Sequence, residues 1–338
     1  MERPRDPVQE AADDSRDLYD IATWEPRSVL DRLSAGVYRG LVTSGRLVVV
    51  ALALAILLGQ LVIVALAVRN NPYVGAFALL SIVPALGLAA YVWYADITTS
   101  EPLTLLVGTF LLGILFASFA AVVNSLAQPG FFALGAIGVV LFFYLIVAPI
   151  EETVKWLAIR LWAFWSDRFD AVVDGAVYGA MAGLGFATIE NAIYITNQYQ
   201  AAIEAGQGVF EMTLQTAAVR TFAGPGHVLY SAFAGYYLGL AKFNRKHAGP
   251  IVVKGLVIAA LIHATYNTLV SFLPGLVAVL ADIPEAAAFI GFVIVYDGIF
   301  AYVLLRKLGR YRRTYNDVHT TKTVNFGEER VERDSFEE

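Results

Sequence analysis

Residues 131–160 read FFALGAIGVVLFFYLIVAPIEETVKWLAIR and contain both features that decide the fold. Residues 131–150 carry no charged side chain, and an apolar run of about 20 residues is long enough to cross a bilayer as an α-helix. Glu151, Glu152 and Lys155 follow in the same helical register. The stretch therefore predicts a membrane-spanning helix with ionisable groups inside it.

Seven further apolar runs surround this stretch and predict an all-α, polytopic membrane protein with about eight transmembrane helices. They lie at 47–68, 74–95, 103–127, 172–195, 216–241, 251–272 and 284–305. The chain then divides into an N-terminal tail (1–45), an eight-span membrane domain (46–305) and a C-terminal tail (306–338). Within the first tail, residues 28–43 place Leu30, Leu33, Val37 and Leu41 on one helical face. This pattern is typical of an interfacial helix, with a solvated linker helix as the alternative.

The composition excludes several classes of protein. Of all residues, 58% are hydrophobic, 16% are charged, and none is cysteine. Residues 1–46 and 306–338 hold 31 charges, which leaves 22 for the 259 residues between them. A central region so poor in charge excludes a soluble enzyme and a nucleic-acid partner. The lack of cysteine excludes disulfides, thiol catalysis and thiolate zinc sites.

The distribution of Lys and Arg predicts the orientation of the chain in the cell membrane. With a cytoplasmic N-terminus, 21 basic residues fall in cytoplasmic segments and only Arg69 falls on the opposite side. The remaining two, Arg220 and Lys254, lie just inside span ends. Because cytoplasmic loops are enriched in Lys and Arg, this asymmetry predicts that both termini are cytoplasmic.

Polar residues gather in four consecutive predicted spans, the fourth to the seventh. The stretches are APIEETVK at 148–155, FATIEN at 186–191, GPGH at 224–227 and HATYN at 263–267. Ionisable groups inside a span are costly and usually serve function, so their clustering predicts one shared site. Counted at 1.5 Å per residue from the cytoplasmic ends, His227 and His263 lie ~20 Å deep but Glu152 only ~12 Å.

The local spacings suggest how these groups interact. Lys155 shares a helical face with both Glu151 and Glu152, and two adjacent carboxylates beside one lysine do not ionise together easily. A purely structural ion pair at the end of a span is the alternative. Glu190 has no basic residue nearby in sequence, so its partner must come from another span, with a His as the candidate. Gly175, Gly179 and Gly183 form a stripe that lets another helix approach closely.

The four motifs in this order resemble the PrsW intramembrane protease family. The match consists of Glu-Glu-x-x-Lys at 151–155, Phe-x-x-x-Glu at 186–190, the His at 227 and His-x-x-x-Asn at 263–267. The wider superfamily contains CAAX prenyl proteases, bacteriocin-processing enzymes and the scaffold subunit of gamma-secretase. The prenyl proteases have His where this chain has Glu190. The resemblance implies an intramembrane endopeptidase that cleaves single-span membrane proteins, an anti-sigma factor being the best-known case.

Peptide hydrolysis requires a base that activates water, a group that stabilises the oxyanion, and an acid for the leaving amine. We expect Glu151 to be the base and Glu152 to assist it or to donate the proton, with Lys155 in support. His263 and Asn267 would stabilise the oxyanion, and His227 and Glu190 would position the water. The sequence leaves open whether zinc takes part, in which case Glu190, His227 and His263 would be its ligands. The metal-free mechanism is slightly preferred.

Two other classes of function share some of these features. Intramembrane Glu and His residues also form proton relays, which would make the chain a proton-coupled transporter. Transporters often contain inverted repeats, however, and here the polar residues occupy only one half of the chain. A non-catalytic membrane scaffold is the second alternative, and it would not need the double Glu.

Overall fold

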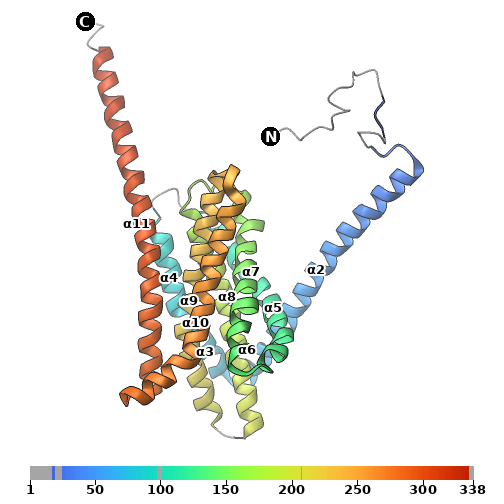
Figure 1. Ribbon diagram of the computed structural model, residues 1–338, viewed down its shortest axis with the longest axis vertical. Coiled ribbons are helices and arrows are strands. Elements are labelled where there is room, and N and C mark those ends of the chain that lie inside the picture. The colour runs from blue at the N-terminus through green and yellow to red at the C-terminus, as the bar shows by residue number, and fades with distance from the viewer. Residues whose placement is uncertain (1–16, 20–24, 97–100, 207, 335–338) are drawn as a thin grey trace. The chain divides into compact units, whose positions relative to one another are not determined.

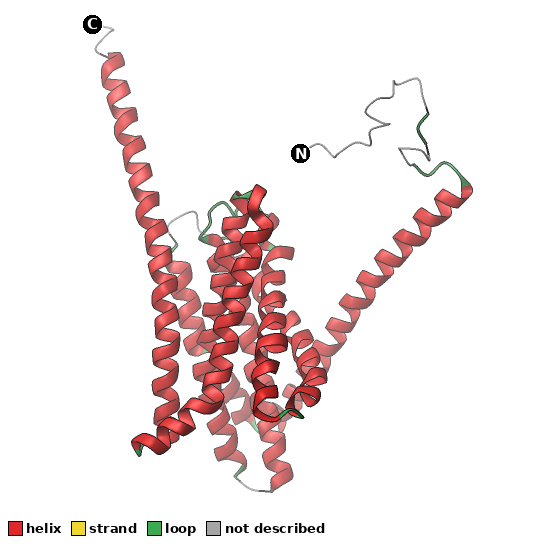
Figure 2. Cartoon of the chain, viewed as in Figure 1, coloured by secondary structure: helices red, strands yellow, loops and turns green. Residues whose placement is uncertain are grey.

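The computed structural model describes residues 17–19, 25–96, 101–206 and 208–334. These residues form helices joined by short connections, with no β-strand among them (Figure 2). The all-α prediction is therefore confirmed. The chain divides into two compact units, Met1–Ala55 and Ile56–Glu338, and each is described by itself.

Helix α2 (Val29–Asn70) accounts for most of the described part of the first unit and continues into the second. It begins with a capping box, because the Asp31 carboxylate accepts from the Ser28 backbone N–H and the Ser28 hydroxyl accepts from the Asp31 N–H. The predicted interfacial segment 28–43 is thus helical from Val29 onward and continuous with the first span. Its location on the bilayer surface stays a prediction, and residues 1–16 of the tail lie outside the described residues.

The second unit is a bundle of helices that run up and down beside one another (Figure 1). The helices after α2 are α3 (Pro72–Ser81), α4 (Val83–Tyr94), α5 (Leu103–Phe132), α6 (Gly135–Phe142), α7 (Ala148–Leu161), α8 (Asp174–Ala205), α9 (Val209–Phe243), α10 (Ala248–Ala281) and α11 (Glu285–Asp334). A π-helical turn, η1 (Phe143–Val147), joins α6 to α7.

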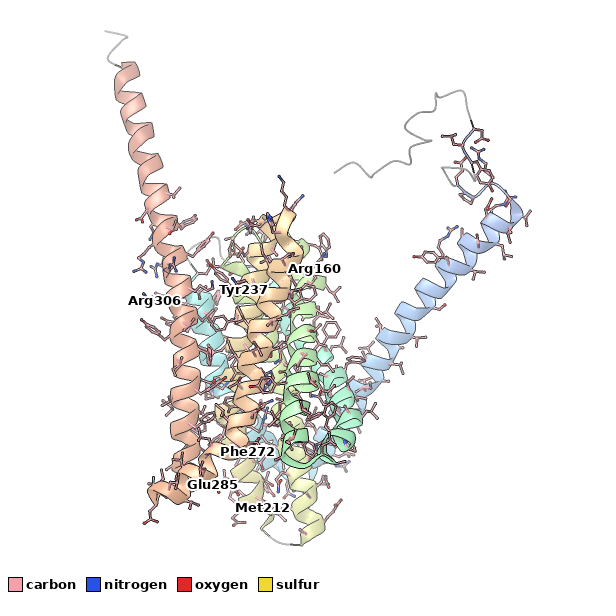
Figure 3. All side chains as sticks on the ribbon, in the orientation of Figure 1. Arg160, Met212, Tyr237, Phe272, Glu285 and Arg306 are labelled. Carbon is pink, nitrogen blue, oxygen red and sulfur yellow. The ribbon has the colours of Figure 1, made fainter. Side chains whose placement is uncertain are left out.

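Six helical segments of the described chain are long and apolar enough to cross a membrane. They are Val50–Asn70, Pro72–Tyr94, Leu103–Phe132, Gly135–Trp165, Arg245–Ala281 and Glu285–Val318. Helices α8 and α9 have 32 and 35 residues and carry many polar side chains. A polytopic membrane protein is therefore confirmed, while the number of eight spans stays a prediction. Figure 3 shows Arg160 and Arg306 toward one end of the bundle and Met212 and Glu285 toward the other.

Helices α8 and α9 pack closely because three glycines of α8 face the backbone of α9. A Cβ at Gly175, Gly179 or Gly183 would lie 2.2–2.3 Å from a carbonyl oxygen of α9, and at Gly183 that oxygen belongs to His227. No side chain fits at such a distance. The predicted role of the glycine stripe in helix packing is confirmed, and this packing sets the height of His227 relative to Glu190.

Candidate active site

Helix α7 brings Glu151, Glu152 and Lys155 into the interior of the bundle, where all three are buried. The helix starts directly after the π-helical turn η1 and has Pro149 in its first turn. π-Helical turns within helices occur frequently at functional sites, and a proline there removes one backbone hydrogen bond. The irregular backbone thus immediately precedes the paired carboxylates.

Glu152 and Lys155 form the fully buried centre of the site. The Lys155 ammonium donates to Glu152 Oε1 at 2.8 Å, and His263 Nδ1 lies 2.8 Å from the same oxygen. Lys155 Nζ also lies 2.9 Å from His227 Nδ1 and 4.2 Å from the centre of the Phe186 ring. Glu152 is therefore the carboxylate that neutralises Lys155, and it holds the His263 ring in place.

Glu151 has a different environment from its neighbour. Its Oε1 atom accepts a hydrogen bond from the Asn124 amide of α5 at 3.0 Å. Its Oε2 atom is buried and has no hydrogen-bond partner, with Lys155 Nζ at 3.7 Å, His263 Nε2 at 3.8 Å and His227 Nδ1 at 4.0 Å. One carboxylate oxygen thus remains available at the meeting point of three nitrogen atoms.

Glu190 of α8 is paired with two residues of α9. His227 Nε2 lies 2.8 Å from Glu190 Oε2, and the Arg220 guanidinium donates to the same oxygen. The His partner was expected from the sequence, but Arg220 was not. Arg220 also donates through Nε to Asn191 Oδ1 at 2.9 Å. The Phe186 ring stacks on the His227 imidazole, with the ring centres 5.2 Å apart.

A cavity of about 310 Å³ connects these groups. The predicted site residues that line it are Glu151, Glu190, His227, His263 and Asn267, whereas Glu152 and Lys155 lie behind it. The two imidazole rings are 5.3 Å apart, centre to centre. The two carboxylates therefore lie at the same depth in the bundle as the histidines. Counting residues along single helices had placed Glu152 closer to the cytoplasmic end.

Several residues of the site were missed by the sequence analysis. Arg220, Asn124, Tyr194, Tyr230 and Tyr266 also line the cavity. Arg220 stands seven residues before His227, two turns along the same helix, and this spacing could have indicated a shared face. Asn124 is the one amide side chain in the predicted span 103–127, so it was also a signal. The tyrosines carry no such signal, because aromatic side chains are common in spans.

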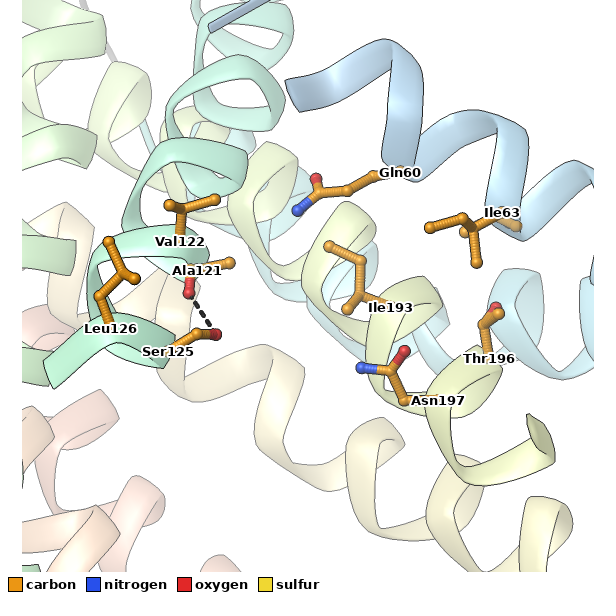
Figure 4. A pocket seen from close by; sticks show the side chains of 10 residues that line it. Gln60, Ile63, Ala121, Val122, Ser125, Leu126, Ile193, Thr196 and Asn197 are labelled. Atoms are coloured by element: carbon orange, nitrogen blue, oxygen red, sulfur yellow. Dashed lines mark hydrogen bonds between the residues drawn. The ribbon is translucent and has the colours of Figure 1, made fainter. Parts of the chain in front are cut away.

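A second cavity, of about 330 Å³, lies between α2, α5 and α8 (Figure 4). Its polar lining residues are Gln60, Ser125, Thr196 and Asn197, and none of the lining residues is ionisable. Ser125 is already bonded to the Ala121 carbonyl oxygen at 2.8 Å. A cavity without an acid, a base or a metal ligand cannot support hydrolysis, so the first cavity is the candidate active site.

Comparison with known proteins supports this assignment. Residues 101–299 match the family described as PrsW family intramembrane metalloprotease, and this range contains every residue of the cavity. The chain belongs to the PrsW family. It is therefore a membrane-embedded peptide hydrolase.

The relatives of this PrsW family member include three bacterial proteins named Protease PrsW. The protein from Geobacillus kaustophilus is 30% identical over 57% of this chain and 80% of its own length. The proteins from Halalkalibacterium halodurans and Bacillus subtilis are 29% and 28% identical, over 57% and 58% of this chain and 83% and 84% of their own lengths. No solved structure matches the chain significantly.

The family description implies a metal, and the cavity contains a suitable set of ligands. Glu151, His227 and His263 each offer one ligand atom, and these atoms all lie within 4.8 Å of one another. Two imidazoles and a carboxylate form a zinc site that leaves a position open. The Glu152 contact to His263 Nδ1 leaves Nε2 directed at the unpaired oxygen of Glu151. The sequence analysis placed Glu190 in this set. Glu190 is paired with Arg220, and the carboxylate grouped with both histidines is Glu151, so a ligand role of Glu190 stays a prediction.

Proposed function

We propose that this PrsW family protease cleaves single-span membrane proteins with a water molecule activated by Glu151. The observation that carries the proposal is the buried, unpartnered Oε2 atom of Glu151, which lines the cavity beside two histidines. A carboxylate oxygen without a donor is able to accept a proton. Glu152 has no comparable access to the cavity.

The surrounding residues would hold the reacting groups in place. Glu152 orients His263 through Nδ1, and Glu190 orients His227 through Nε2. Each ring thereby presents its other nitrogen toward Glu151. We therefore assign Glu152 a positioning role, while Glu190 and His227 position the water as expected from the sequence.

The proton would move from water to Glu151 and then to the leaving amine. As the water oxygen bonds to the carbonyl carbon, negative charge develops on the carbonyl oxygen. The Asn267 amide and His263 line the cavity and would stabilise that charge. Arg220 adds a permanent positive charge in the same cavity. When the carbon–nitrogen bond breaks, Glu151 returns its proton to the amine.

A metal ion would use the same residues. Glu151, His227 and His263 would hold it, and when bound it would polarise the carbonyl and activate water. His227 Nδ1 contacts Lys155 Nζ at 2.9 Å, so Lys155 would have to give up that contact. Elemental analysis of active protein distinguishes the two forms. One zinc per chain, with activity lost on chelation and restored by zinc, supports the metal-dependent form, whereas full activity without metal supports Glu151 alone.

The membrane location of the site supports the proposed substrate class. The catalytic cavity lies among membrane-spanning helices, so a substrate has to present its scissile bond within or near the bilayer. A single-span protein, such as a regulator of the anti-sigma-factor type, fits this requirement. We propose that the protein lies in the cell membrane with both termini cytoplasmic, which the Lys and Arg distribution supports.

The decisive experiment is cleavage of a single-span reporter by the purified chain in lipid nanodiscs. We expect the wild type to cleave it and Glu151→Gln to be inactive, because an amide keeps the shape but cannot accept the proton. Glu204→Gln is the matched control, since Glu204 is an exposed glutamate on α8. Full activity of Glu151→Gln would remove Glu151 from the mechanism. A folded wild type that cleaves no reporter would favour the scaffold alternative.

A further inference from the structure

Three carboxylates from different parts of the chain meet at the ends of α4, α5 and α8, remote in sequence from the catalytic motifs. Asp96 follows α4, Glu101 directly precedes the N-cap residue of α5, and Asp174 is the first residue of α8. One oxygen of each lies within 4.8 Å of the others. We call these three residues the carboxylate triad.

Glu101 is the residue of the triad that requires an explanation. It is 4% exposed, and neither of its carboxylate oxygens has a hydrogen-bond partner in the part of the chain that the structure describes. Leaving a buried carboxylate without a donor is costly, so such groups are normally paired or coordinate a metal. The other buried glutamates, Glu151 and Glu152, each accept at least one hydrogen bond.

Tyr178 supplies an independent observation at the same place. It lies one turn after Asp174 on α8, is fully buried, and its hydroxyl has no hydrogen-bond partner. The strongest electrostatic interactions of this hydroxyl are with Glu101 and then with Asp174. A buried polar atom without a partner needs an explanation, and a ligand of the triad or a water bound to that ligand would supply one.

We propose that the carboxylate triad binds one hard divalent cation, with Ca²⁺ as the best fit. Carboxylate oxygens without nitrogen or sulfur ligands favour Ca²⁺ and Mg²⁺ over zinc. Mg²⁺ demands near-ideal octahedral geometry, keeps several of its waters and usually takes only one or two carboxylates, whereas Ca²⁺ accepts several carboxylates in flexible geometry. Three carboxylates whose oxygens all lie within 4.8 Å of one another therefore favour Ca²⁺.

The bound cation would join the ends of three helices. Helix α5 carries Asn124 and α8 carries Glu190, which are both part of the catalytic cavity. The site is distinct from that cavity, whose ligand set contains two histidines. The competing occupant is a proton: burial and, next, contact with the Asp96 carboxyl raise the pKa of Glu101 to about 9.

Calorimetric titration of CaCl₂ into the purified full chain, stripped with EDTA, tests the proposal. We expect one saturable Ca²⁺ site per chain in the wild type and at least tenfold weaker binding in Glu101→Gln. The exposed Asp167→Asn is the matched control and should bind like the wild type. Glu151→Gln should also bind like the wild type, which separates this site from the catalytic cavity and makes the test independent of the proposed function.

Two results would overturn the proposal. No saturable binding at millimolar CaCl₂ would mean that the triad holds protons only. Wild-type affinity in Glu101→Gln would place any bound Ca²⁺ elsewhere. If Glu101→Gln does not fold, Tyr178→Phe removes only the hydroxyl that faces the triad. A severalfold loss of Ca²⁺ affinity in that variant supports the proposal, and unchanged affinity contradicts it.

Discussion

The catalytic cavity and the carboxylate triad both contain buried carboxylates, but their surroundings differ. At the catalytic site, Lys155 Nζ and His263 Nδ1 each lie 2.8 Å from Glu152 Oε1, and Arg220 pairs with Glu190. In the triad, neither oxygen of Glu101 has a hydrogen-bond donor among the described residues. The catalytic site thus carries its own counter-charges, whereas no described residue supplies one to Glu101.

This difference separates charge that is used for chemistry from charge that is used for binding. Built-in cations pair with Glu152 and Glu190, and these carboxylates contact the two histidines, so the site is organised before a substrate arrives. A carboxylate without a donor instead gains stability only when a proton or a cation binds.

The largest expected effect is on proteolysis. Glu151→Gln should lower the rate of reporter cleavage about 10²- to 10⁴-fold, the usual contribution of a general base. The calorimetric Ca²⁺ affinity of the triad should stay at the wild-type value, because no triad residue is altered. Loss of Ca²⁺ binding in this variant would show that the two regions are not independent.

Removal of the buried cation behind the cavity, Lys155, should mainly affect stability. Lys155→Met leaves the fully buried Glu152 carboxylate without its counter-charge, and breaking a buried pair costs about 3–5 kcal/mol. Unfolding by denaturant in mixed micelles measures the loss. The double variant Glu152→Gln/Lys155→Met removes both charges and should recover most of it, since Gln still accepts from His263. A double variant as unstable as the single one would contradict the assigned pairing.

Ca²⁺ should stabilise the chain through the triad. At 100 times the dissociation constant, a ligand that binds only the folded state adds about 2.7 kcal/mol to the free energy of unfolding. We expect this gain in the wild type and in Asp167→Asn, measured as the rise in unfolding midpoint over an EDTA-treated sample. An equal gain in Glu101→Gln would assign the stabilisation to another site.

The smallest effect is expected for Glu101→Gln in the absence of metal. Because the Glu101 side chain makes no hydrogen bond to a donor, its neutral replacement should change the free energy of unfolding by no more than about 1 kcal/mol. Glu152→Gln removes the counter-charge of Lys155 and should cost more. Denaturant unfolding of both variants in EDTA measures the two losses in the free energy of unfolding. Equal losses in Glu101→Gln and Glu152→Gln would contradict this prediction.

Local sequence patterns were sufficient for the class of fold and for most of the cavity. Apolar runs of about 20 residues predict helices that cross a membrane because only a helix satisfies every backbone group within one segment. The spacing of Glu151, Glu152 and Lys155 places them together on one helix, as observed. The glycine stripe of α8 predicted a close neighbour, and α9 is that neighbour.

The pairings between helices were decided only by the tertiary structure. Helical periodicity determines which residues share a face, but not how far one helix slides or rotates against the next. That offset makes Arg220 a second partner of Glu190, withdraws Glu152 behind the cavity and leaves Glu151 facing it. It also brings Asp96, Glu101 and Asp174 together from three helix ends. Sequence thus determines the helices and their polar faces, whereas close packing of backbones determines which of those faces meet.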